Sequence, residues 1–299
     1  MKITITGATG FVGQNLAAFL TANKHQITAL SMREKAWLSK LDLQSDAIIH
    51  LAGKAHDLSS ATDSDAYFKV NTMLTQQLFD AFVHSDITDF FYFSSVKAVA
   101  DSVNDVLEEE VIPQPLTPYG QSKQRAEQYL LKQVLPEGKR LFIIRPCMIH
   151  GPGNKGNLNL LYKIVQRGIP WPLAAFENKR SFLSIDNLNF LVLQLLENRK
   201  VTSDVFNFSD DLPLSTNELV ALIAEHSDKK PRLWSINKRI VNTVAIVGDK
   251  LRLPLNTERL KKLTENYVVS NLKVKRALSI ENLPYTAVAG LEKTIRSFR

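Results

Sequence analysis

The chain opens with MKITITGATGFVG (residues 1–13), in which an alternating apolar strand leads directly into Gly7, Gly10 and Gly13. A helical pattern, QNLAAFLTANK at residues 14–24, follows. At such a junction Gly7 allows the tight turn, Gly10 lets a pyrophosphate approach the helix N-terminus, and Gly13 lets the helix pack close to the sheet. The spacing G-x-x-G-x-x-G differs from the usual G-x-G-x-x-G. Its position nevertheless predicts a phosphate-binding turn.

The first half of the chain alternates short apolar segments with segments of helix length. The expected strands are ITITG (3–7), HQITALS (25–31), DAIIHLAG (46–53), DFFYFSS (89–95) and RLFIIRPCMIHG (140–151). Helices are expected at 14–24, 71–85 and 119–135. This alternation is typical of right-handed crossovers over a parallel sheet that is covered on both faces. We therefore predict a Rossmann-like, doubly wound α/β fold.

Beyond residue 150 the alternation loosens. A loop at 151–158 precedes expected helices at 160–168 and 184–200, a strand at 205–209, and a helix at 215–226 that begins with a Ser215–Glu218 capping box. Residues 1–150 plus about 183–210 are predicted to form the NAD(P)-binding domain, with the second segment returning to its sheet. Residues about 151–182 plus 211–299 are predicted to form a smaller α/β domain for substrate.

Composition narrows the class of protein. The chain has 299 residues, of which 44% are hydrophobic and 22% charged, as is usual for globular proteins. The single cysteine, Cys147, excludes an internal disulfide and fits a reducing compartment. No apolar run approaches the ~18 residues of a membrane helix, and the N-terminus lacks an export signal. We expect a cytoplasmic protein with no membrane partner and, since no metal-ligand spacing occurs, no metal site.

The net charge of +7 is unevenly distributed. Residues 228–299 hold 16 Lys and Arg against 6 Asp and Glu, a net of +10, and the rest of the chain is at −3. A basic C-terminal quarter could attract an anionic ligand such as a nucleotide diphosphate. No zinc-finger spacing or aromatic-interleaved basic run is present, so we expect no nucleic-acid partner.

The end of the second expected strand bears on the choice of cofactor. A carboxylate at this point binds the ribose 2′-hydroxyl of NAD, whereas an arginine accommodates the 2′-phosphate of NADP. In ALSMRE (29–34), Ser31 stands where the acid is expected and Arg33 follows. NADP is therefore the expected preference. NAD stays open, because Arg33 could equally point to solvent.

The stretch YGQSK places Tyr119 and Lys123 four residues apart, on one face of a helix. A tyrosine with its ordinary pKa of about 10 is a poor base at neutral pH. A neighbouring ammonium is expected to lower this pKa toward the working range. Ser95, at the end of a strand, precedes Tyr119 by 24 residues. Together with the glycines, these residues predict a catalytic set.

At this point the sequence resembles the extended short-chain dehydrogenases/reductases that act on nucleotide sugars. The motifs that carry the resemblance are TGATGFVG, DAIIHLAG, FKVNT, FYFSSV, PLTPYGQSK, RPCMIHGPG and KRSFLSIDNL, in the family's order over roughly residues 1–190. NLKVKRAL at 271–278 is similar to the family's C-terminal helices, less specifically.

The resemblance implies a role for each matched residue. Tyr119 would be the acid/base at the reacting oxygen, Lys123 would hold the nicotinamide ribose, and Ser95, rather than Ser94, would bind the reacting oxygen. Asn71 would anchor the helix beside the catalytic serine. The implied cofactor contacts are Gly7, Thr9, Gly10, Phe11, Val12, Gly13, Ser31, Arg33, Leu51, Ala52, Gly53, Asn71, Tyr119, Lys123 and Pro146.

For the substrate, the resemblance implies that Arg180 grips the diphosphate and that Asn157 contacts the sugar nucleotide, although a plain loop role for Asn157 is open. His56 follows the carboxyl end of a strand, where ligands bind in open α/β sheets. His50, inside an apolar strand, is interpreted as a core histidine. Cys147 is interpreted as a buried thiol.

The expected reaction is hydride transfer at a hydroxyl or keto carbon of a nucleotide-linked sugar, with C4 of a UDP-sugar favoured. A 4-epimerase that recycles bound NAD and a 4-keto-sugar reductase that consumes NADPH share this machinery. Val96 and Lys97 stand where dehydratases of the family carry an Asp-Glu pair, which disfavours dehydration. A non-catalytic NADP-sensing regulator is the alternative. A homodimer through the helices after Asn71 and Tyr119 is possible.

Overall fold

The structure, a computed structural model, describes residues 1–54, 64–154, 157–251 and 256–298. Within this part of the chain a parallel sheet has the strand order β2-β1-β3-β4-β6-β9. Its strands are β1 (Lys2–Thr6), β2 (Gln26–Leu30), β3 (Ala47–His50), β4 (Asp89–Phe93), β6 (Arg140–Pro146) and β9 (Asp204–Phe208). The order changes direction between β1 and β3, and ligands bind such sheets outside the carboxyl ends of the strands at this point.

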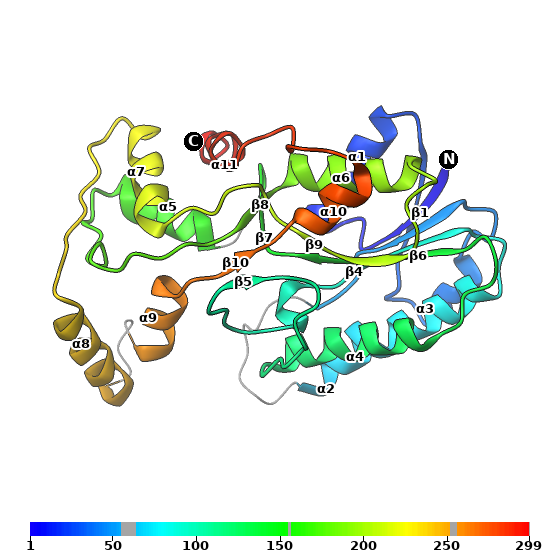
Figure 1. The fold of residues 1–299 in the computed structure, drawn as a ribbon, viewed down its shortest axis with the longest axis horizontal. Coiled ribbons are helices and arrows are strands. Elements are labelled where there is room, and N and C mark those ends of the chain that lie inside the picture. The colour runs from blue at the N-terminus through cyan, green and yellow to red at the C-terminus, as the bar shows by residue number, and fades with distance from the viewer. Residues whose placement is uncertain (55–63, 155–156, 252–255, 299) are drawn as a thin grey trace.

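Both faces of the sheet are buried, because alternate residues of each strand point to opposite sides. Ile3, Ile49 and Phe91 belong to one core cluster, whereas Ile48 and Phe90 belong to another. Helices α1 (Phe11–Ala22) and α6 (Ile185–Glu197) lie over the first face, and α3 (Leu74–Val83) and α4 (Pro118–Lys132) over the second (Figure 1). The predicted doubly wound Rossmann-like fold is confirmed.

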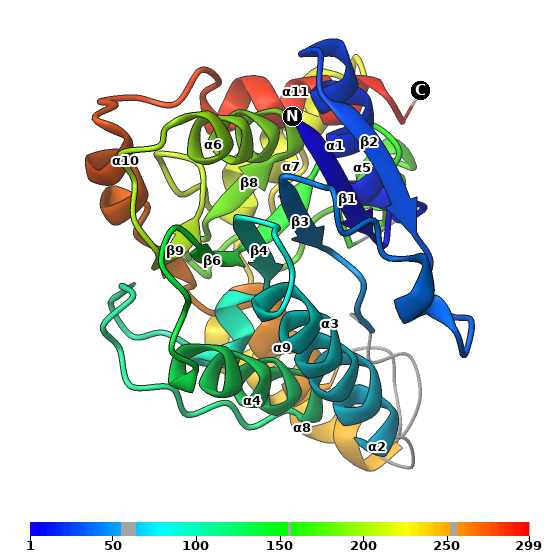
Figure 2. The same cartoon turned by 90° about the vertical axis from the view of Figure 1, so that its right-hand side faces the viewer.

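The second half of the chain adds two small parallel sheets and a group of helices at one end of the molecule (Figures 1 and 2). The paired strands are β5 (Val106–Leu107) with β10 (Val268–Val269) and β7 (Met148–His150) with β8 (Phe182–Ser184). The further helices are α2 (Ser64–Tyr67), α5 (Asn157–Gln166), α7 (Thr216–Glu225), α8 (Lys238–Leu251), α9 (Thr257–Thr264), α10 (Leu272–Leu278) and α11 (Ala287–Arg296). Among the described residues, no helix is both long and apolar enough to cross a membrane.

A third core cluster lies outside the main sheet. It joins side chains of α5, α7, α8, α9 and α11, such as Leu158, Ile223, Ala245, Leu260 and Ile295. The predicted capping box at the start of α7 is present, with the Ser215 and Glu218 side chains each bonded to the other's backbone N–H. This cluster is distinct from the two core clusters that cover the main sheet. As expected, the chain returns to that sheet after β8: α6 packs on one face, and β9 pairs with β6.

Some elements differ from the sequence-based expectation. The strand predicted at 140–151 ends at Pro146, because proline has no N–H with which to continue a ladder, and Met148 begins β7 in a different sheet. The helix predicted from residue 71 begins earlier, at Ser64, and passes through a π-helical segment, Phe68–Met73, before α3. The short interval between β2 and β3, for which no helix was predicted, holds a 3₁₀ helix, Trp37–Lys40.

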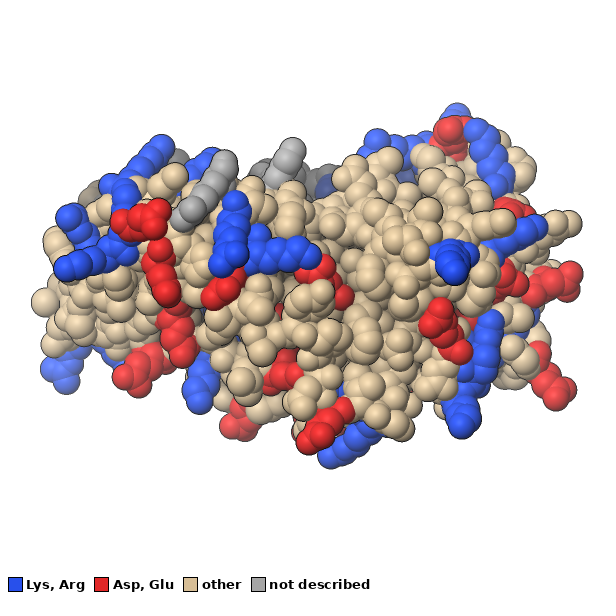
Figure 3. Space-filling view, turned by 90° about the horizontal axis from the view of Figure 1, so that it is seen from above, with Lys and Arg blue, Asp and Glu red and all other residues tan. Residues whose placement is uncertain are grey.

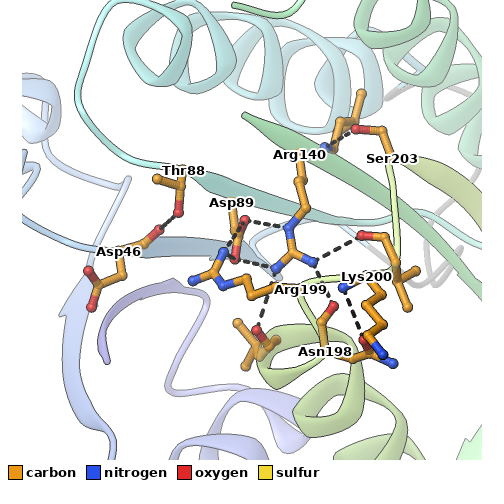
Figure 4. A network of polar contacts seen from close by, with 11 residues as sticks. Asp46, Thr88, Asp89, Arg140, Asn198, Arg199, Lys200 and Ser203 are labelled. Carbon is orange, nitrogen blue, oxygen red and sulfur yellow. Dashed lines mark hydrogen bonds and ion pairs between the residues drawn. The ribbon is translucent and has the colours of Figure 1, made fainter. Parts of the chain in front are cut away.

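The amino edge of the sheet is held by a buried ion network (Figure 4). Asp89, fully buried at the start of β4, accepts two hydrogen bonds of 2.8 Å from the Nε and Nη2 of Arg140, the first residue of β6. Arg199, after α6, contacts the same carboxylate at 2.8 Å. Arg140 also donates to the carbonyls of Asn198 and Val201. One carboxylate thus ties two strands to the α6–β9 connection.

We expect Asp89→Ala to lower the free energy of unfolding by about 3–5 kcal/mol, because it leaves the buried Arg140 guanidinium without its counter-charge. Urea denaturation followed by circular dichroism measures the change. The matched control is Asp204→Ala, which breaks the partly exposed ion pair with Lys273 and should cost no more than about 1 kcal/mol. Equal losses in the two variants would contradict the structural role of the network.

Candidate active site

The glycine turn connects β1 to α1. Gly7 has φ of +70°, and a Cβ there would lie 2.7 Å from the backbone N of Ala52. A Cβ on Gly13 would lie 2.3 Å from the carbonyl oxygen of Gly7. Gly13 therefore lets α1 lie directly against the backbone that leaves the end of β1. A Cβ on Gly10 would meet only the Gly7 carbonyl, at 3.3 Å.

The end of β3 lies directly against this turn. The Leu51 N–H donates to the Thr6 carbonyl, and the Ala52 N–H donates to the Thr6 hydroxyl at 3.1 Å. His50 is 1% exposed, and its ring nitrogens contact the hydroxyls of Thr6 and Thr75. Burial and the nearby Lys123 charge lower the pKa of His50 to about 3. His50 is therefore a neutral core histidine, as interpreted from the sequence.

The start of α4 carries Tyr119 to Ser95. Ser95 follows β4 and caps the 3₁₀ turn Val96–Ala98, with its hydroxyl accepting from the Lys97 N–H. A Cβ on Gly120 would lie 2.3 Å from the Lys97 carbonyl oxygen, so α4 begins in direct backbone contact with this turn. The Ser95 hydroxyl lies close enough to the Tyr119 hydroxyl to lower the pKa of the phenol, against the larger rise caused by burial. The structure thus brings together the two hydroxyls that the sequence predicted as partners.

Asp101 holds the N-terminus of α4 in place. Its carboxylate accepts from the backbone N–H groups of Leu116 and Thr117 and from the Thr117 hydroxyl. Thr117 in turn caps α4, accepting from the Gly120 N–H at 3.2 Å. The sequence analysis did not single out Asp101 or Gly120. The available signal was the glycine within the helical pattern YGQSK. Glycine destabilises a helix relative to alanine, so a glycine inside a helical pattern indicates a position where another backbone comes too close for a Cβ.

Lys123 lies one turn further along α4 and is 5% exposed. Its ammonium donates to the Phe93 carbonyl at 2.7 Å and lies 4.9 Å from the centre of the Tyr92 ring. Burial lowers the pKa of Lys123 to about 8, against the opposing charge of Glu127. A Cβ on Gly53 would lie 3.3 Å from the Lys123 Nζ. The Lys123 ammonium therefore packs against the loop that follows β3.

The pKa of Tyr119 differs from the sequence-based expectation. Burial raises this pKa, and the nearby Ser95 hydroxyl opposes the rise. The Lys123 ammonium donates its hydrogen bond to the Phe93 carbonyl. The phenol consequently keeps its proton at neutral pH in this structure. The expected lowering of the pKa by the lysine is not found.

Asn71 joins the loop after β3 to α4. Its Oδ1 accepts from the Lys54 N–H at 2.8 Å, and its Nδ2 donates to the Lys54 carbonyl and to the Ser122 hydroxyl. The residue was expected to anchor a helix beside the catalytic serine. The contacts join the loop holding Gly53 to α4, the helix that carries Lys123 and whose start packs against the Ser95 turn. The π-helical segment Phe68–Met73 directs the side chain inward.

Tyr67 is a further residue at the site that the sequence analysis did not identify. Its buried ring meets the Tyr119 ring edge-on, with centroids 6.3 Å apart, and Lys54 lies 4.8 Å from the Tyr67 centroid. An aromatic residue four positions before Asn71 carries no pattern of its own in the sequence. Its importance follows from the fold alone.

Arg180 lies toward the other half of the molecule. Its backbone bridges Leu214 and Tyr267. Burial lowers the pKa of Arg180, while the charges of Glu265, Tyr267 and Cys147 oppose the shift. Cys147 directly follows β6, so Arg180 is near the carboxyl edge of the sheet. The Cys147 thiol is buried and burial raises its pKa, consistent with an inert thiol.

Tyr267 connects this region to the catalytic serine turn. Its hydroxyl donates to the Ala100 carbonyl at 2.7 Å, and the Lys97 ammonium lies 4.3 Å from the centre of its ring. Lys97 also donates to the Asp101 carbonyl. The lysine that replaces the dehydratase acid is thus directed away from the Ser95 hydroxyl, toward the segment carrying Arg180.

The remaining predicted residues fall into two groups. Thr9, Phe11 and Val12 belong to the turn and first residues of α1, and Pro146 ends β6. Ser31 and Arg33 are exposed directly after β2, the strand beside β1. His56 and the side chain of Asn157 lie outside the described residues. Within the described ranges, no group of three or more His, Cys, Asp or Glu residues could hold a metal ion.

A dinucleotide fits the residues at this edge of the sheet. The N-terminus of α1 has no side-chain cap, so its first N–H groups are available to an anion. A Cβ on Gly10 would have one close neighbour, the Gly7 carbonyl oxygen at 3.3 Å, so the backbone here can be approached by a phosphate. Gly53 lies against the buried Lys123, which is one helical turn from Tyr119 on α4. This is the arrangement of a nucleotide-dependent enzyme of the Rossmann type.

The chain belongs to the NAD dependent epimerase/dehydratase family, whose model matches residues 3–208. It is 31% identical over 250 residues to UDP-glucose 4-epimerase of Vibrio cholerae, covering 76% of each chain. It is 26% identical over 242 residues to GDP-6-deoxy-D-mannose reductase of Pseudomonas aeruginosa, covering 75% of this chain and 79% of the relative.

Solved structures share the fold over the whole chain. UDP-glucuronic acid 4-epimerase from Bacillus cereus, in complex with NAD, matches with a TM-score of 0.75 and 20% identity over 100% of this chain and 98% of that one. RMD from Pseudomonas aeruginosa, complexed with NADPH, matches with a TM-score of 0.74 and 21% identity over 99% and 98%. The predicted family is confirmed.

The two glycines of the α1 turn should respond differently to alanine. Gly13→Ala places a methyl group against the Gly7 carbonyl, and overpacking of this kind lowers the free energy of unfolding by about 1–3 kcal/mol. Gly10→Ala should change stability by less than about 1 kcal/mol, because φ is −77° and the site is open. It should weaken NADPH binding about tenfold or more, however, by filling the space for phosphate. Thermal unfolding and fluorescence titration measure the two effects, and unchanged NADPH affinity in Gly10→Ala would contradict the phosphate site.

Proposed function

We propose that this protein transfers a hydride between a nicotinamide cofactor and a hydroxyl- or keto-bearing carbon of a nucleotide-linked sugar, with C4 of a UDP-sugar favoured. The observation that carries the proposal is the gathering of Ser95, Tyr119 and the buried Lys123 at the carboxyl edge beside the glycine turn, where Gly120 at the start of α4 packs on the Lys97 carbonyl. Membership of the family and the similarity to sugar-nucleotide epimerases and reductases support this chemistry. A regulator that only senses NADP has no use for this hydroxyl pair.

In this proposal Ser95 orients the reacting oxygen and Tyr119 moves its proton. Reduction of a ketone consumes a proton, and Tyr119 holds one at neutral pH because burial raises its pKa. In the oxidation direction the Tyr119 phenolate would take the proton of the sugar hydroxyl, so the raised pKa of this phenol favours reduction at neutral pH. The cofactor supplies or accepts the hydride, and the protein contributes position and tuned proton transfer.

The same proposal assigns the parts of the ligands to different regions. The turn from Gly7 to Gly13 and the loop Leu51–Gly53 hold the dinucleotide. Arg180, near the carboxyl edge, binds the substrate diphosphate. Its positive charge and its partial burial favour this role, because a partly buried guanidinium forms strong hydrogen bonds to phosphate. Residues 151–182 and 211–299 then form the substrate-binding domain, while 1–150 and 183–210 bind NAD(P).

The preference for NADP rests on Ser31 and Arg33 at the exposed end of β2. No carboxylate occupies the first position after this strand, and a guanidinium is within two residues of it. Of the two candidate activities, 4-epimerase and 4-keto-sugar reductase, this feature favours the reductase, which uses NADPH once. The relatives include both a 4-epimerase and a reductase.

We also propose that the enzyme works in the cytoplasm, in keeping with its single buried thiol. The proposed homodimer uses α3 and α4. The exposed positions of α4 include Gln121, Arg125 and Gln128, which suit a polar interface. Sedimentation velocity determines the oligomeric state, and a dimer that survives charge reversal at Arg125 would contradict this interface.

Tyr119→Phe should lower turnover by about 10²–10⁴-fold, because it removes the proton donor and leaves the ring in place. NADPH affinity should stay within about twofold of the unaltered protein, since the glycine turn and Lys123 are unchanged. Tyr129→Phe on the same helix is the matched control; its hydroxyl donates to Asp80 away from the site. Turnover is measured with a panel of UDP-sugars and their 4-keto derivatives. Preserved turnover in Tyr119→Phe would refute the mechanism.

The nucleotide carried by the purified protein separates the two outcomes. The protein is denatured, and any released nucleotide is identified by mass spectrometry. We expect little NAD⁺ to be released, and tighter binding of NADPH than of NADH to the empty protein, as for a reductase. About one equivalent of retained NAD⁺ would instead indicate an epimerase and contradict the role of Arg33. Failure of both nucleotides to bind would overturn the glycine site.

A further inference from the structure

Helix α8 has an exposed apolar face. Ile240, Val244, Val247 and Leu251 are 58%, 46%, 44% and 65% exposed. Their spacing of four, three and four residues places them along one side of the helix. Val241, Ala245 and Gly248 are buried and form the adjacent side, which packs toward α9 and the third core cluster. The fold therefore already uses one apolar side of α8 and leaves a second one in solvent.

Isolated exposed aliphatic residues are ordinary in soluble proteins. Four of them in a continuous row on one helix are not, because grouped apolar surface marks an interaction site. Trp234, 57% exposed in the segment leading into α8, adds an aromatic side chain to the same region of the chain. Tryptophan suits a boundary between apolar and aqueous phases.

Positive charge is concentrated in the same segment. Residues 229–262 hold 10 Lys and Arg against 2 Asp and Glu, a net of +8, so the remainder of the chain is at −1. Within α8, Arg239 and Lys250 are exposed and lie on the helix side next to the apolar row. Arg259 and Lys261 are exposed on the neighbouring α9. By contrast, the face in Figure 3 carries basic and acidic side chains intermixed.

We propose that α8 docks this protein on an anionic membrane surface, with Ile240, Val244, Val247 and Leu251 inserted at the headgroup boundary and the surrounding Lys and Arg side chains on the lipid phosphates. An amphipathic helix with a basic polar side binds membranes in this way, through buried apolar area and attraction to anionic lipid. The inference goes beyond the proposed function and is independent of it. It also departs from the expectation that the protein has no membrane partner.

Charge decides between this occupant and a second copy of the chain. Two copies meeting through α8 would bring two segments of +8 together, and like charges repel at close range. A lipid surface rich in anionic headgroups attracts the same charge. Nucleic acid would attract the basic side chains of residues 229–262, but it would leave the row of exposed aliphatic side chains in water. The membrane surface satisfies both features of the helix.

The position of α8 agrees with surface docking. It lies at the outer edge of the molecule, away from the main sheet, and reaches the same lower level as α2 and α4 in both views (Figures 1 and 2). Docking through α8 therefore keeps the main sheet itself away from the lipid. It places the lower side of the molecule, which includes α4, toward the membrane.

The test is binding of the full chain to vesicles of phosphatidylcholine with 30% phosphatidylglycerol, measured by flotation. We expect binding to these vesicles and little to pure phosphatidylcholine. Binding should fall steeply between 0.05 and 0.5 M NaCl, because salt screens the attraction. Val244→Asp/Val247→Asp should lower the partition coefficient at least tenfold. Arg239→Gln/Lys250→Gln, which keeps the apolar row, should lower it about tenfold.

The matched control is Leu38→Asp/Leu43→Asp, which introduces the same charge at two leucines that are 47% and 55% exposed near β2. It should bind vesicles as the unaltered protein does. Thermal unfolding verifies that each variant is folded, and the Arg239→Gln/Lys250→Gln pair keeps the proposal testable if the aspartates disturb α8. Because binding is measured without substrate or cofactor, its outcome is separate from that of the proposed reaction.

Three results would overturn the proposal. Absence of binding to the anionic vesicles at 0.05 M NaCl would exclude the membrane as partner. Equal binding of the α8 variants and the control would place the contact elsewhere. A dimer that dissociates in Val244→Asp/Val247→Asp, seen by sedimentation velocity without any vesicle binding, would assign the face to a second copy of the chain.

Discussion

Close contact of backbone with backbone at the carboxyl edge of the sheet is the constraint on which the active site depends. Gly7 lies against Ala52, Gly13 against the Gly7 carbonyl, and Gly120 against the Lys97 carbonyl, each at a distance that excludes a Cβ. The first two contacts bring the α1 N-terminus beside the end of β3. The third brings Tyr119 to Ser95. A side chain at any of these positions would separate two parts of the site.

The two edges of the sheet differ in how they treat buried charge. At the amino edge, Asp89 is paired with two guanidinium groups, so its charge is compensated. At the carboxyl edge, Lys123 has a backbone carbonyl as its partner, and burial lowers its pKa to about 8. Tyr119 is likewise shifted by burial. Shifted pKa values cluster at functional sites. Here Lys123 can exchange a proton near neutral pH, whereas Tyr119 keeps its proton because burial raises its pKa. Stability is therefore concentrated at one edge and reactivity at the other.

Several features of the fold could be predicted from local patterns. The buried strands, the glycine turn and the Tyr119–Lys123 pair are each contained in a few consecutive residues with a recognisable period or spacing. Other features could not. The strand β6 ends at Pro146, although the sequence stays apolar beyond this residue. The π-helical segment Phe68–Met73, in which Asn71 is buried, has no sequence period of its own. The pKa of Tyr119 was expected to fall, but the direction of the Lys123 ammonium depends on the Phe93 carbonyl, 30 residues away.

The sequence by itself determined the parallel α/β sheet and the glycine turn, and it predicted the phosphate site and the reacting side chains, because each depends on short-range periodicity or on residue type. Only the tertiary structure decided that Asn71 fastens the loop after β3 to α4, that Tyr67 packs on Tyr119, and that Arg180 lies near Cys147. It also decided that α8 buries one apolar side and exposes another. These outcomes depend on which segments meet in space, and that is set by packing of the whole chain rather than by any local pattern.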